Sequence, residues 1–338
     1  MIKSIEIENL RGIQNGKLED FTPLTILVGP NSSGKSTVLD AMYLGVCPNA
    51  TNVLNHLRNR EKLKSEVRWL IFLPLKNKRA FVKVQTVGFD ELTETREFVL
   101  SLKLDGDQQT IEVQSKISTI KDSIQHDGES KYFLYIADGS SGNTTEDLPG
   151  AGVKEISYLS FDNIHTAPTL VDLYSKSIEL GRRTAAQKAL NEVLPGLIHV
   201  EIGTYKDKPR LLTVYEDRSV PLASEGDGIQ SLMRLSLSLS ACAEGTVLME
   251  EPEVHQHPRA LRMSAKAILS AVNRGVQVVL STHSLELIDA LLSEAKSADS
   301  LEKVSICRLL LKDGCLKHYR SSGVDAEFQR FEIEDDLR

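Results

Sequence analysis

The chain has 338 residues, of which 41% are hydrophobic and 26% are charged, and its formal net charge is −7. This length can hold a full hydrophobic core, and the negative charge excludes a polycation that binds nucleic acid over its whole surface. The four cysteines form no C-x-x-C pair, so we expect neither a zinc site nor a disulfide framework. No apolar run approaches the roughly 18 residues of a membrane span, and no signal peptide is expected, so the predicted location is cytoplasmic.

The first motif lies between a predicted strand at residues 25–28 and a predicted helix at residues 36–44. Residues 29–37 fit the phosphate-binding pattern G-x-x-x-x-G-K-[ST]. The glycines let backbone N–H groups curl around a phosphate, Lys35 supplies charge for the β- and γ-phosphates, and the Ser36 hydroxyl suits Mg²⁺. The expected nucleotide-binding residues are Gly29, Asn31, Ser32, Ser33, Gly34, Lys35, Ser36 and Thr37.

Basic side chains are concentrated between residues 58 and 83. They could contact a DNA backbone. A solvated helix followed by an edge strand protected by lysines explains them as well, and this second interpretation is favoured. The residues are Arg58, Arg60, Lys62, Lys64, Arg68, Lys76, Lys78, Arg79 and Lys83.

The middle of the chain predicts a β lobe and then helices. Residues 79–87, 96–104 and 109–117 alternate apolar and polar side chains, which predicts antiparallel strands with a turn at Asp105-Gly106. Loops around one short strand at residues 132–136 are expected within residues 121–155, and residues 168–194 are expected to be helical.

An apolar run at residues 246–253 ends in carboxylates. It predicts a buried strand that delivers acids to its C-terminal edge, where open α/β sheets bind ligands. Glu250 suits a metal-holding role, and Glu251 suits activation of the water that attacks a phosphate. An exposed acidic turn after a core strand is the alternative, which the neighbouring P-loop pattern makes the weaker one.

A second apolar strand at residues 278–281 is followed by Thr282-His283-Ser284. The helical pattern of residues 258–273 lies between the two strands, so the unit is predicted to be β-α-β. His283 could therefore hydrogen-bond a γ-phosphate or the attacking water. A lone histidine at a strand end is more often structural.

These motifs together resemble the ATP-binding-cassette (ABC) type of P-loop ATPase. More narrowly, residues 5–13, 250–258 and 282–284 resemble the SMC/RecF-like ATPases and the ATPase domain of OLD-family proteins. The resemblance implies an α/β fold with a mixed, mainly parallel sheet flanked by helices. It implies one domain over residues 1–338, with a nucleotide-binding core at 1–45 and 224–320, an antiparallel β lobe with loops at 65–160 and a helical insertion at 165–200.

The same resemblance implies roles for residues outside the P-loop. Lys35, Glu251 and His283 would be catalytic, Ser36 and Glu250 would hold the metal, and Arg11 would contact the nucleotide. Gly226, Asp227 and Gly228 stand where transporter ATPases carry a Leu-Ser-Gly-Gly-Gln signature. They would face the γ-phosphate held by a second subunit.

No heptad pattern persists, so we expect no coiled-coil arm, and too little chain remains for a Toprim nuclease domain. Residues 306–319 predict a hairpin that turns at Asp313-Gly314. The acidic residues Glu332, Glu334, Asp335 and Asp336 predict a disordered or partner-binding tail rather than a nuclease site.

The predicted function is Mg²⁺-dependent ATP hydrolysis by a homodimer or a higher even oligomer that forms on ATP. The resemblance implies nucleic-acid sensing or processing with a separate effector protein, which could be a nuclease, in antiviral defence or DNA repair; direct DNA binding stays open. The ATPase subunit of a transporter is an alternative, and the missing Leu-Ser-Gly-Gly-Gln argues against it. A nucleotide-gated protein-binding scaffold is another alternative.

Overall fold

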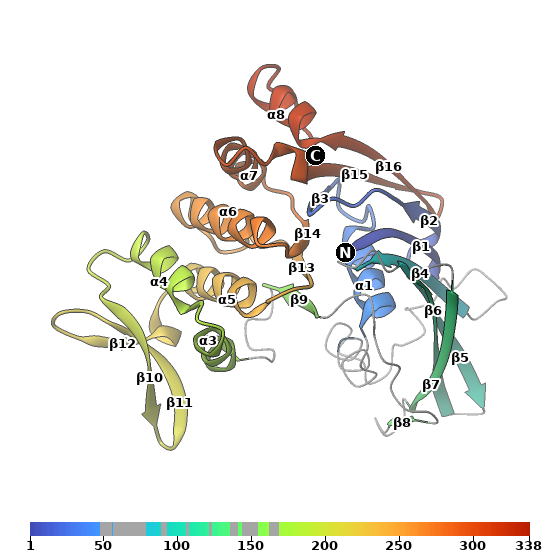
Figure 1. Cartoon of the computed structure of the whole chain (residues 1–338), viewed down its shortest axis with the longest axis horizontal. Helices are drawn as coiled ribbons and strands as arrows, with labels where there is room; N and C mark the ends of the chain where they lie inside the picture. Colours follow the sequence, from blue (N-terminus) through green and yellow to red (C-terminus); the bar gives the residue numbers. More distant parts are fainter. Residues whose placement is uncertain are drawn as a thin grey trace. The chain divides into compact units, whose positions relative to one another are not determined.

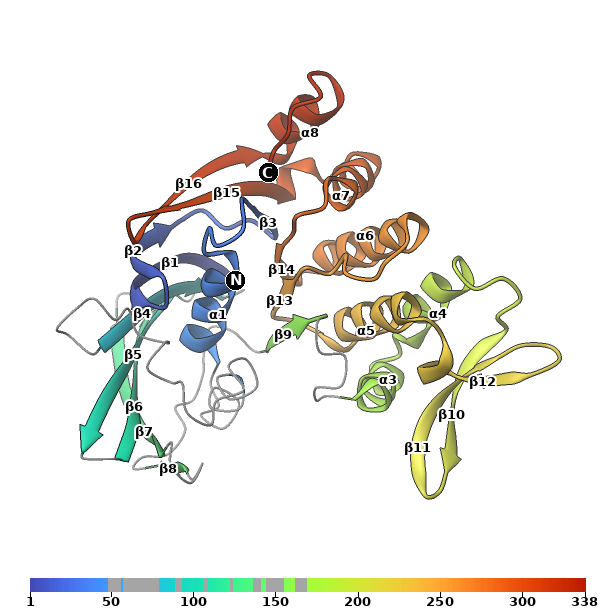
Figure 2. The same ribbon diagram turned by 180° about the vertical axis from the view of Figure 1, so that it is seen from behind.

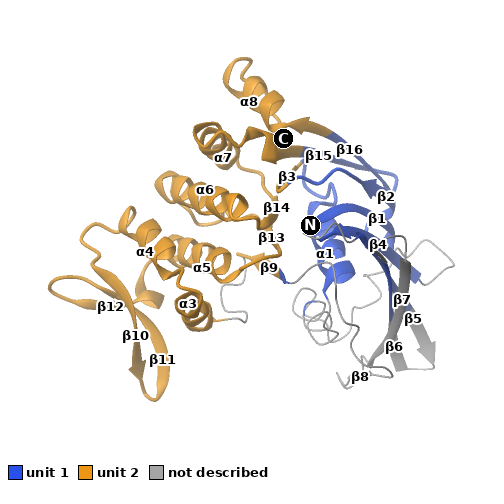
Figure 3. Cartoon of the chain, viewed as in Figure 1, with its two compact units in different colours: residues 1–22, 29–156, 307–319 blue, residues 23–28, 157–306, 320–338 orange. Residues whose placement is uncertain are grey.

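The computed structural model describes residues 1–47, 56, 79–88, 93–105, 108–121, 124–135, 141–143, 155–161 and 169–338. The fold is α/β, with a large mixed sheet flanked by helices, as the sequence predicts (Figure 1). The chain divides into two compact units (Figure 3). Unit 1 comprises residues 1–22, 29–156 and 307–319, and unit 2 comprises residues 23–28, 157–306 and 320–338. The domain boundaries inferred from the sequence stay a prediction.

Unit 1 contains a run of antiparallel strands in the order β8, β7, β6, β5, β4, β1 and β2, after which β2 pairs in parallel with β16. β15 begins in unit 2 and continues in unit 1, whereas β16 begins in unit 1 and ends in unit 2. The bounds are β1 Ile2–Leu10, β2 Ile13–Leu18, β4 Arg79–Val87, β5 Thr93–Asp105, β6 Gln108–Lys121, β7 Ile124–Tyr135, β8 Ser141–Asn143, β15 Val304–Lys312 and β16 Cys315–Ser322.

The predicted antiparallel strands are confirmed as β4, β5 and β6. The pair Asp105↔Gln108 closes the β5–β6 hairpin around the predicted turn, although Gly106 itself lies outside the described residues. The expectation of one short strand at residues 132–136 is wrong, because β7 pairs with β6 from Ile124 to Tyr135. Backbone pairing needs no apolar side chains, so it carries this strand through a polar stretch that the side-chain pattern marks as loop.

One described helix of unit 1, α1 (Lys35–Val46), packs against its strands. A Cβ atom on Gly45 would lie 2.4 Å from Cγ2 of Val84 on β4, so the two backbones approach closely. The buried face of α1 includes Val38, Leu39 and Met42. The last residues of the P-loop, from Lys35, therefore begin a helix that is anchored in the core of unit 1.

The sheet of unit 2 has the strand order β3 (Leu24–Val28), β14 (Gln277–Ser281), β13 (Thr246–Glu250) and β9 (Ile156–Ser160). β3, β14 and β13 are parallel, and each of their residues is buried. Continuous apolar runs of this kind are typical of parallel strands covered on both faces. The three strands predicted around the P-loop, the acidic motif and the histidine are confirmed.

Helices α5, α6 and α7 lie side by side in unit 2 (Figures 1 and 2). The predicted helix at residues 258–273 is confirmed as α6. The predicted helical stretch 168–194 forms two helices, because Gly181 adopts a left-handed backbone (φ +67°) that ends α3. The bounds are α3 Leu170–Glu179, α4 Arg183–Asn191, η2 Leu222–Ser224, α5 Asp227–Ala241, α6 Pro258–Asn273, α7 Leu285–Ser297, η3 Leu301–Lys303 and α8 Gly323–Phe331.

Two apolar clusters form the core of unit 2. The first joins the parallel strands to α6 and α7 through buried residues such as Ile26, Leu280 and Leu291. The second joins α3, α4 and α5 to a small antiparallel sheet, β10 (His199–Tyr205), β11 (Lys208–Val214) and β12 (Ser219–Pro221). α5 contributes to both clusters, so it links the strand layer to the α3–α4 layer.

The C-terminal segment, residues 320–338, is packed against the rest of unit 2. Arg330 donates from Nε and Nη2 to the two carboxylate oxygens of Asp289, at 2.7 and 2.9 Å, and Leu337 is buried in the first cluster. The expected disorder of the acidic tail is therefore wrong, because the apolar Leu337 anchors it; partner binding by this tail stays a prediction. The predicted 306–319 hairpin is confirmed by β15 and β16.

Within the described part of the chain, no helix is long and apolar enough to cross a membrane. Most of the predicted basic cluster, from Arg58 to Lys78, lies outside the described residues. Arg79 and Lys83 are on β4, where Lys83 pairs with Glu97 of β5 at 3.1 Å.

Candidate nucleotide-binding site

The P-loop follows β3 directly and belongs to unit 1. Three of its residues have positive φ: Gly29 at +137°, Ser32 at +61° and Gly34 at +95°. A Cβ atom on Gly29 would lie 2.4 Å from the carbonyl oxygen of Leu309, so a larger residue has no room there. This left-handed loop turns the chain from the strand end into the N-terminus of α1, which is a geometry suited to anion binding.

Lys35 is the first residue of α1 and is buried, with 6% of its surface exposed. Its Nζ donates to the carbonyl oxygens of Gly29 at 2.9 Å and Pro30 at 3.1 Å, so the ammonium group lies inside the loop. Ser36 and Thr37 follow on the same turn. The first turn of α1 contains no acidic side chain, and it therefore concentrates positive potential where a phosphate chain would bind.

Arg11 lies in the turn between β1 and β2 with a left-handed backbone (φ +50°). Its Nη1 donates to Oδ2 of Asp40, a buried residue of α1. His56 Nε2 lies 2.8 Å from the other carboxylate oxygen. This ion pair ties the β1–β2 turn to the helix that follows the P-loop, and a contact between Arg11 and nucleotide stays a prediction.

In unit 2, the acidic motif and the histidine lie at one edge of the parallel strands. Glu250 is in register with Ser281, and Ser281 is in register with Leu27. The Glu251 N–H donates to the Ser281 carbonyl at 3.0 Å, and the Thr282 N–H donates to the Leu27 carbonyl at 3.1 Å. The carboxyl ends of β3, β14 and β13 therefore meet, and β3 is covalently continuous with the P-loop at Gly29.

The side chains at this edge differ in burial. Glu250 is 9% exposed and accepts a hydrogen bond from the Tyr158 hydroxyl at 3.3 Å. Glu251 has a left-handed backbone (φ +46°), and its Oε1 lies 3.6 Å from His283 Nε2. Both partners of this pair are more than a third exposed. A non-glycine residue in this backbone region marks strain of the kind found at functional sites.

Glu253 organises the loop that carries His283. Its Oε1 accepts hydrogen bonds from the Thr282 hydroxyl at 2.6 Å and from the His283 N–H at 2.9 Å. Ser284 then caps α7 by accepting from the Leu287 N–H at 3.2 Å. The backbone of His283 is thus held on both sides.

The Gly226-Asp227-Gly228 segment begins α5, with Gly226 as its N-cap. A Cβ atom on Gly228 would lie 2.5 Å from the carbonyl oxygen of His255, so α5 packs tightly on the loop that follows the acidic motif. A Cβ atom on Gly226 would meet no described atom within 4 Å. Gly228 is therefore required by packing, whereas Gly226 faces open space.

Comparison with known proteins agrees with this geometry. Residues 24–289 match a family described as "AAA domain, putative AbiEii toxin, Type IV TA system". The chain belongs to this AAA-type family. A Helicobacter pylori protein named ATP/GTP phosphatase is 22% identical over 374 residues, covering 100% of both proteins. A DNA double-strand break repair Rad50 ATPase of Methanopyrus kandleri is 39% identical over 57 residues, 17% of this chain and 6% of that protein.

Solved structures share the fold of this AAA-type chain. An SMC head bound to the C-terminal winged-helix domain of ScpA has a TM-score of 0.56 and 15% identity, covering 95% of this chain and 98% of that one. An SMC head from Pyrococcus furiosus with an extended coiled coil, bound to the C-terminal domain of ScpA, has a TM-score of 0.51 and 13% identity, covering 99% of both chains. The chain is a P-loop ATPase with an SMC-like fold, as predicted. The narrower likeness to OLD-family proteins stays a prediction.

The sequence does not reveal every residue at the site of this AAA-type protein. The sequence shows Glu253 only as one of several acids in the motif. Its role could not be predicted, because its two hydrogen-bond donors, Thr282 and His283, follow a different strand. No sequence pattern marks Asp40 or Tyr158, because each forms its hydrogen bond with a residue that is distant in the sequence, Arg11 and Glu250 respectively. The predicted residues fall into two groups: 29–37 and Arg11 in unit 1, and 226–228, Glu250, Glu251 and His283 in unit 2.

Proposed function

We propose that the chain binds Mg²⁺·ATP with its P-loop and the strand ends of unit 2, and hydrolyses the bond between the β- and γ-phosphates. One observation carries this proposal. β3 leads directly into the P-loop and is parallel to β14 and β13, whose carboxyl ends present His283 and the pair Glu250 and Glu251.

Phosphate binding falls to the loop and to Lys35. The ammonium group would exchange its bonds to the Gly29 and Pro30 carbonyls for bonds to β- and γ-phosphate oxygens. The glycine backbone and the N-terminus of α1 supply further N–H donors. Because these interactions are charge-assisted, they account for the affinity of the site.

The oxygen donors at the site fit Mg²⁺. Ser36 offers a hydroxyl at the start of α1, and Glu250 offers a carboxylate that is mostly buried. The described residues include no group of three or more His, Cys, Asp or Glu side chains placed around a metal. Mg²⁺ in such ATPases takes one or two protein oxygens together with phosphates and waters, so the proposal needs no protein ligand beyond Ser36 of unit 1 and Glu250 of unit 2. When bound, Mg²⁺ neutralises charge on the β- and γ-phosphate oxygens.

We assign activation of the attacking water to Glu251. Its carboxylate accepts a proton as the water oxygen attacks the γ-phosphorus, and ADP leaves with the electron pair of the broken P–O bond. His283, whose Nε2 lies 3.6 Å from Glu251 Oε1, orients that carboxylate and donates to the γ-phosphate. Glu253 holds the His283 backbone in place for this role.

Assembly on ATP is the second part of the proposal. One chain carries one P-loop and one candidate signature segment, so a complete site of the ABC type needs two chains. The open space at Gly226 supports an approach by a second subunit there. The SMC heads with the same fold are bound to ScpA, which supports a protein partner for this chain as well.

We place this activity in genome defence or DNA repair, with a separate effector protein. The Rad50 relative supports repair, and the family description, which names a putative toxin, supports defence. Direct DNA contact through the basic residues 58–83 stays a prediction. No observation favours the transporter or the scaffold alternative.

Phosphate release by the purified chain tests the proposal. We expect release from ATP that needs Mg²⁺, stops with excess EDTA and is lost in Lys35→Ala, whose ATP affinity falls by about tenfold or more because a charge-assisted contact is removed. Lys208→Ala, an exposed lysine on β11, is the matched control. GTP is tested beside ATP because the Helicobacter relative is named for both nucleotides. Equal release by wild type and Lys35→Ala would contradict the assignment.

A further inference from the structure

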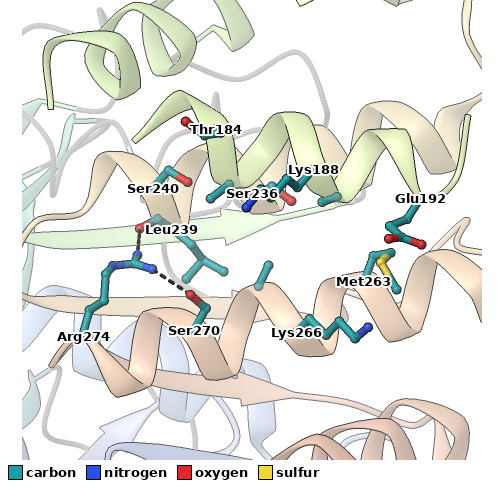
Figure 4. Close-up of a pocket in the computed structure, with 13 residues that line it drawn as sticks. Thr184, Lys188, Glu192, Ser236, Leu239, Ser240, Met263, Lys266, Ser270 and Arg274 are labelled. Carbon is teal, nitrogen blue, oxygen red and sulfur yellow. Dashed lines mark hydrogen bonds between the residues drawn. The ribbon is translucent and has the colours of Figure 1, made fainter. Parts of the chain in front are cut away.

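A pocket of about 420 Å³ lies between α4, α5 and α6 in unit 2 (Figure 4). No residue used in the proposed nucleotide chemistry lines it. Its walls follow from helical periodicity, because residues four apart share one face of a helix. Lys188 lies on the exposed stripe of α4. Lys266 and Ser270 lie on one stripe of α6, and Arg274, the C-cap residue of that helix, continues the stripe.

The charges around the pocket are mainly positive. Lys188, Lys266 and Arg274 line it, against one carboxylate, Glu192. In the described part of the chain, neither lysine forms an ion pair. Arg274 donates to the Ser270 hydroxyl at 3.2 Å and to the Leu239 carbonyl at 3.0 Å, which fixes its guanidinium at one end of the pocket. This set favours an anionic group on the occupant.

The middle of the pocket combines apolar walls with a buried hydroxyl. Leu239 and Met263 are buried and contribute apolar surface. Ser236 of α5 is 3% exposed, and its hydroxyl has no hydrogen-bond partner among the described residues. Figure 4 shows it between Lys188 of α4 and the α6 stripe. A buried hydroxyl without a partner is unfavourable, and an acceptor on a ligand would satisfy it.

We propose that this pocket binds a small organic anion. Its apolar body would lie against Leu239 and Met263, and its phosphate, sulfonate or carboxylate group would lie between Lys266 and Arg274, with Lys188 opposite. The volume is in the range of small-molecule sites, which favours such a ligand over a segment of a partner protein. The proposal concerns binding and does not depend on ATP turnover.

The test uses 8-anilinonaphthalene-1-sulfonate, an aromatic sulfonate whose fluorescence rises in apolar surroundings, and the full chain with saturating Mg²⁺ and ATP. We expect saturable binding of one probe per chain, at least about tenfold tighter than that of N-phenyl-1-naphthylamine, which has the same rings without the sulfonate. Lys266→Glu should weaken the sulfonate by about tenfold, or about 1.4 kcal/mol. Lys208→Glu makes the same charge change on β11 and should leave binding unchanged.

A second variant tests the location without removing a charge. Ala267→Trp places a large ring inside the pocket and should abolish saturable binding while the melting temperature shows a folded chain. Probe binding that is seen without nucleotide and is lost at saturating Mg²⁺ and ATP would overturn the proposal, because the probe would then occupy the nucleotide site. Unchanged binding in a folded Ala267→Trp, equal weakening by Lys208→Glu, or the absence of saturable binding at millimolar probe would also overturn it.

Discussion

At the scale of single residues, the proposed chemistry depends most on Glu251. Its backbone is left-handed, and its carboxylate lies beside His283 at the end of a buried strand. We predict that Glu251→Gln lowers the rate of phosphate release by about 10²-fold or more, because an amide cannot accept the proton of the attacking water. Steady-state assays check this. Glu302→Gln, the same change at an exposed residue of η3, should keep the wild-type rate.

The role of a residue could be predicted from the sequence where the residue belongs to a contiguous motif. Lys35, Glu250 and Glu251 are of this kind, since the strand before each motif and the residue types within it indicate the role. Glu253 is different: its hydrogen bonds to Thr282 and His283 join two strand ends that become neighbours only in the sheet. No local pattern can report such a contact.

At the scale of elements, Glu253 links the loop after β13 to the loop before α7. We predict that Glu253→Ala lowers kcat by about tenfold or more and leaves KM for ATP nearly unchanged, because a displaced His283 weakens catalysis rather than ground-state binding. Glu253→Gln keeps a carbonyl oxygen as acceptor and should restore most of the rate. A parallel loss in both variants, or a change confined to KM, would contradict this positioning role.

The N-terminus of α5 offers a matched pair of glycines. Gly228→Ala would place a methyl group 2.5 Å from the His255 carbonyl oxygen and should lower the free energy of unfolding by about 1–3 kcal/mol. Gly226 has φ −60° and open space around it, so Gly226→Ala should lower the free energy of unfolding by less than about 1 kcal/mol. Denaturant unfolding measures both. The reverse order would show that the packing of α5 differs from this description.

Helices and strands whose ends are marked by local residues were predictable from the sequence. Strands that depend on backbone pairing with a neighbouring strand were not. The bounds of α6 follow from Pro258 at its first turn and from Gly275 just beyond its end. The break between α3 and α4 depends on Gly181. The sequence predicts one helical stretch because the apolar periodicity continues on both sides of this glycine. β7 escaped prediction because its pairing with β6 runs through residues of low strand propensity.

At the scale of the whole molecule, the account predicts a dimer that depends on nucleotide. With saturating Mg²⁺·ATP, Glu251→Gln should reach about twice the chain mass of 37.5 kDa in light scattering, because unhydrolysed ATP would hold two chains together. Gly226→Trp added to that variant should keep it monomeric, since the open space at Gly226 accepts the ring in one chain but not beside a partner. A hydrolysis-deficient variant that stays monomeric would contradict the composite site.

The fold class of the whole chain was predictable because the P-loop, the acidic motif and the histidine each follow an apolar strand. The division into two units was not, because each unit is assembled from three separate stretches of the chain, and one boundary falls between Val28 and Gly29, where β3 leads directly into the P-loop. The basic stretch at residues 58–83 lies mostly outside the described residues, so its contact with DNA still rests on charge alone.

The central claim is that Lys35 and the P-loop hold ATP while Glu251 is needed to hydrolyse it. The most direct test is the identity of the nucleotide that stays bound to Glu251→Gln after incubation with Mg²⁺·ATP and rapid removal of free nucleotide. The account predicts about one intact ATP per chain on this variant, ADP and phosphate from the wild type, and little nucleotide on Lys35→Ala. ADP on Glu251→Gln at the wild-type rate would contradict it.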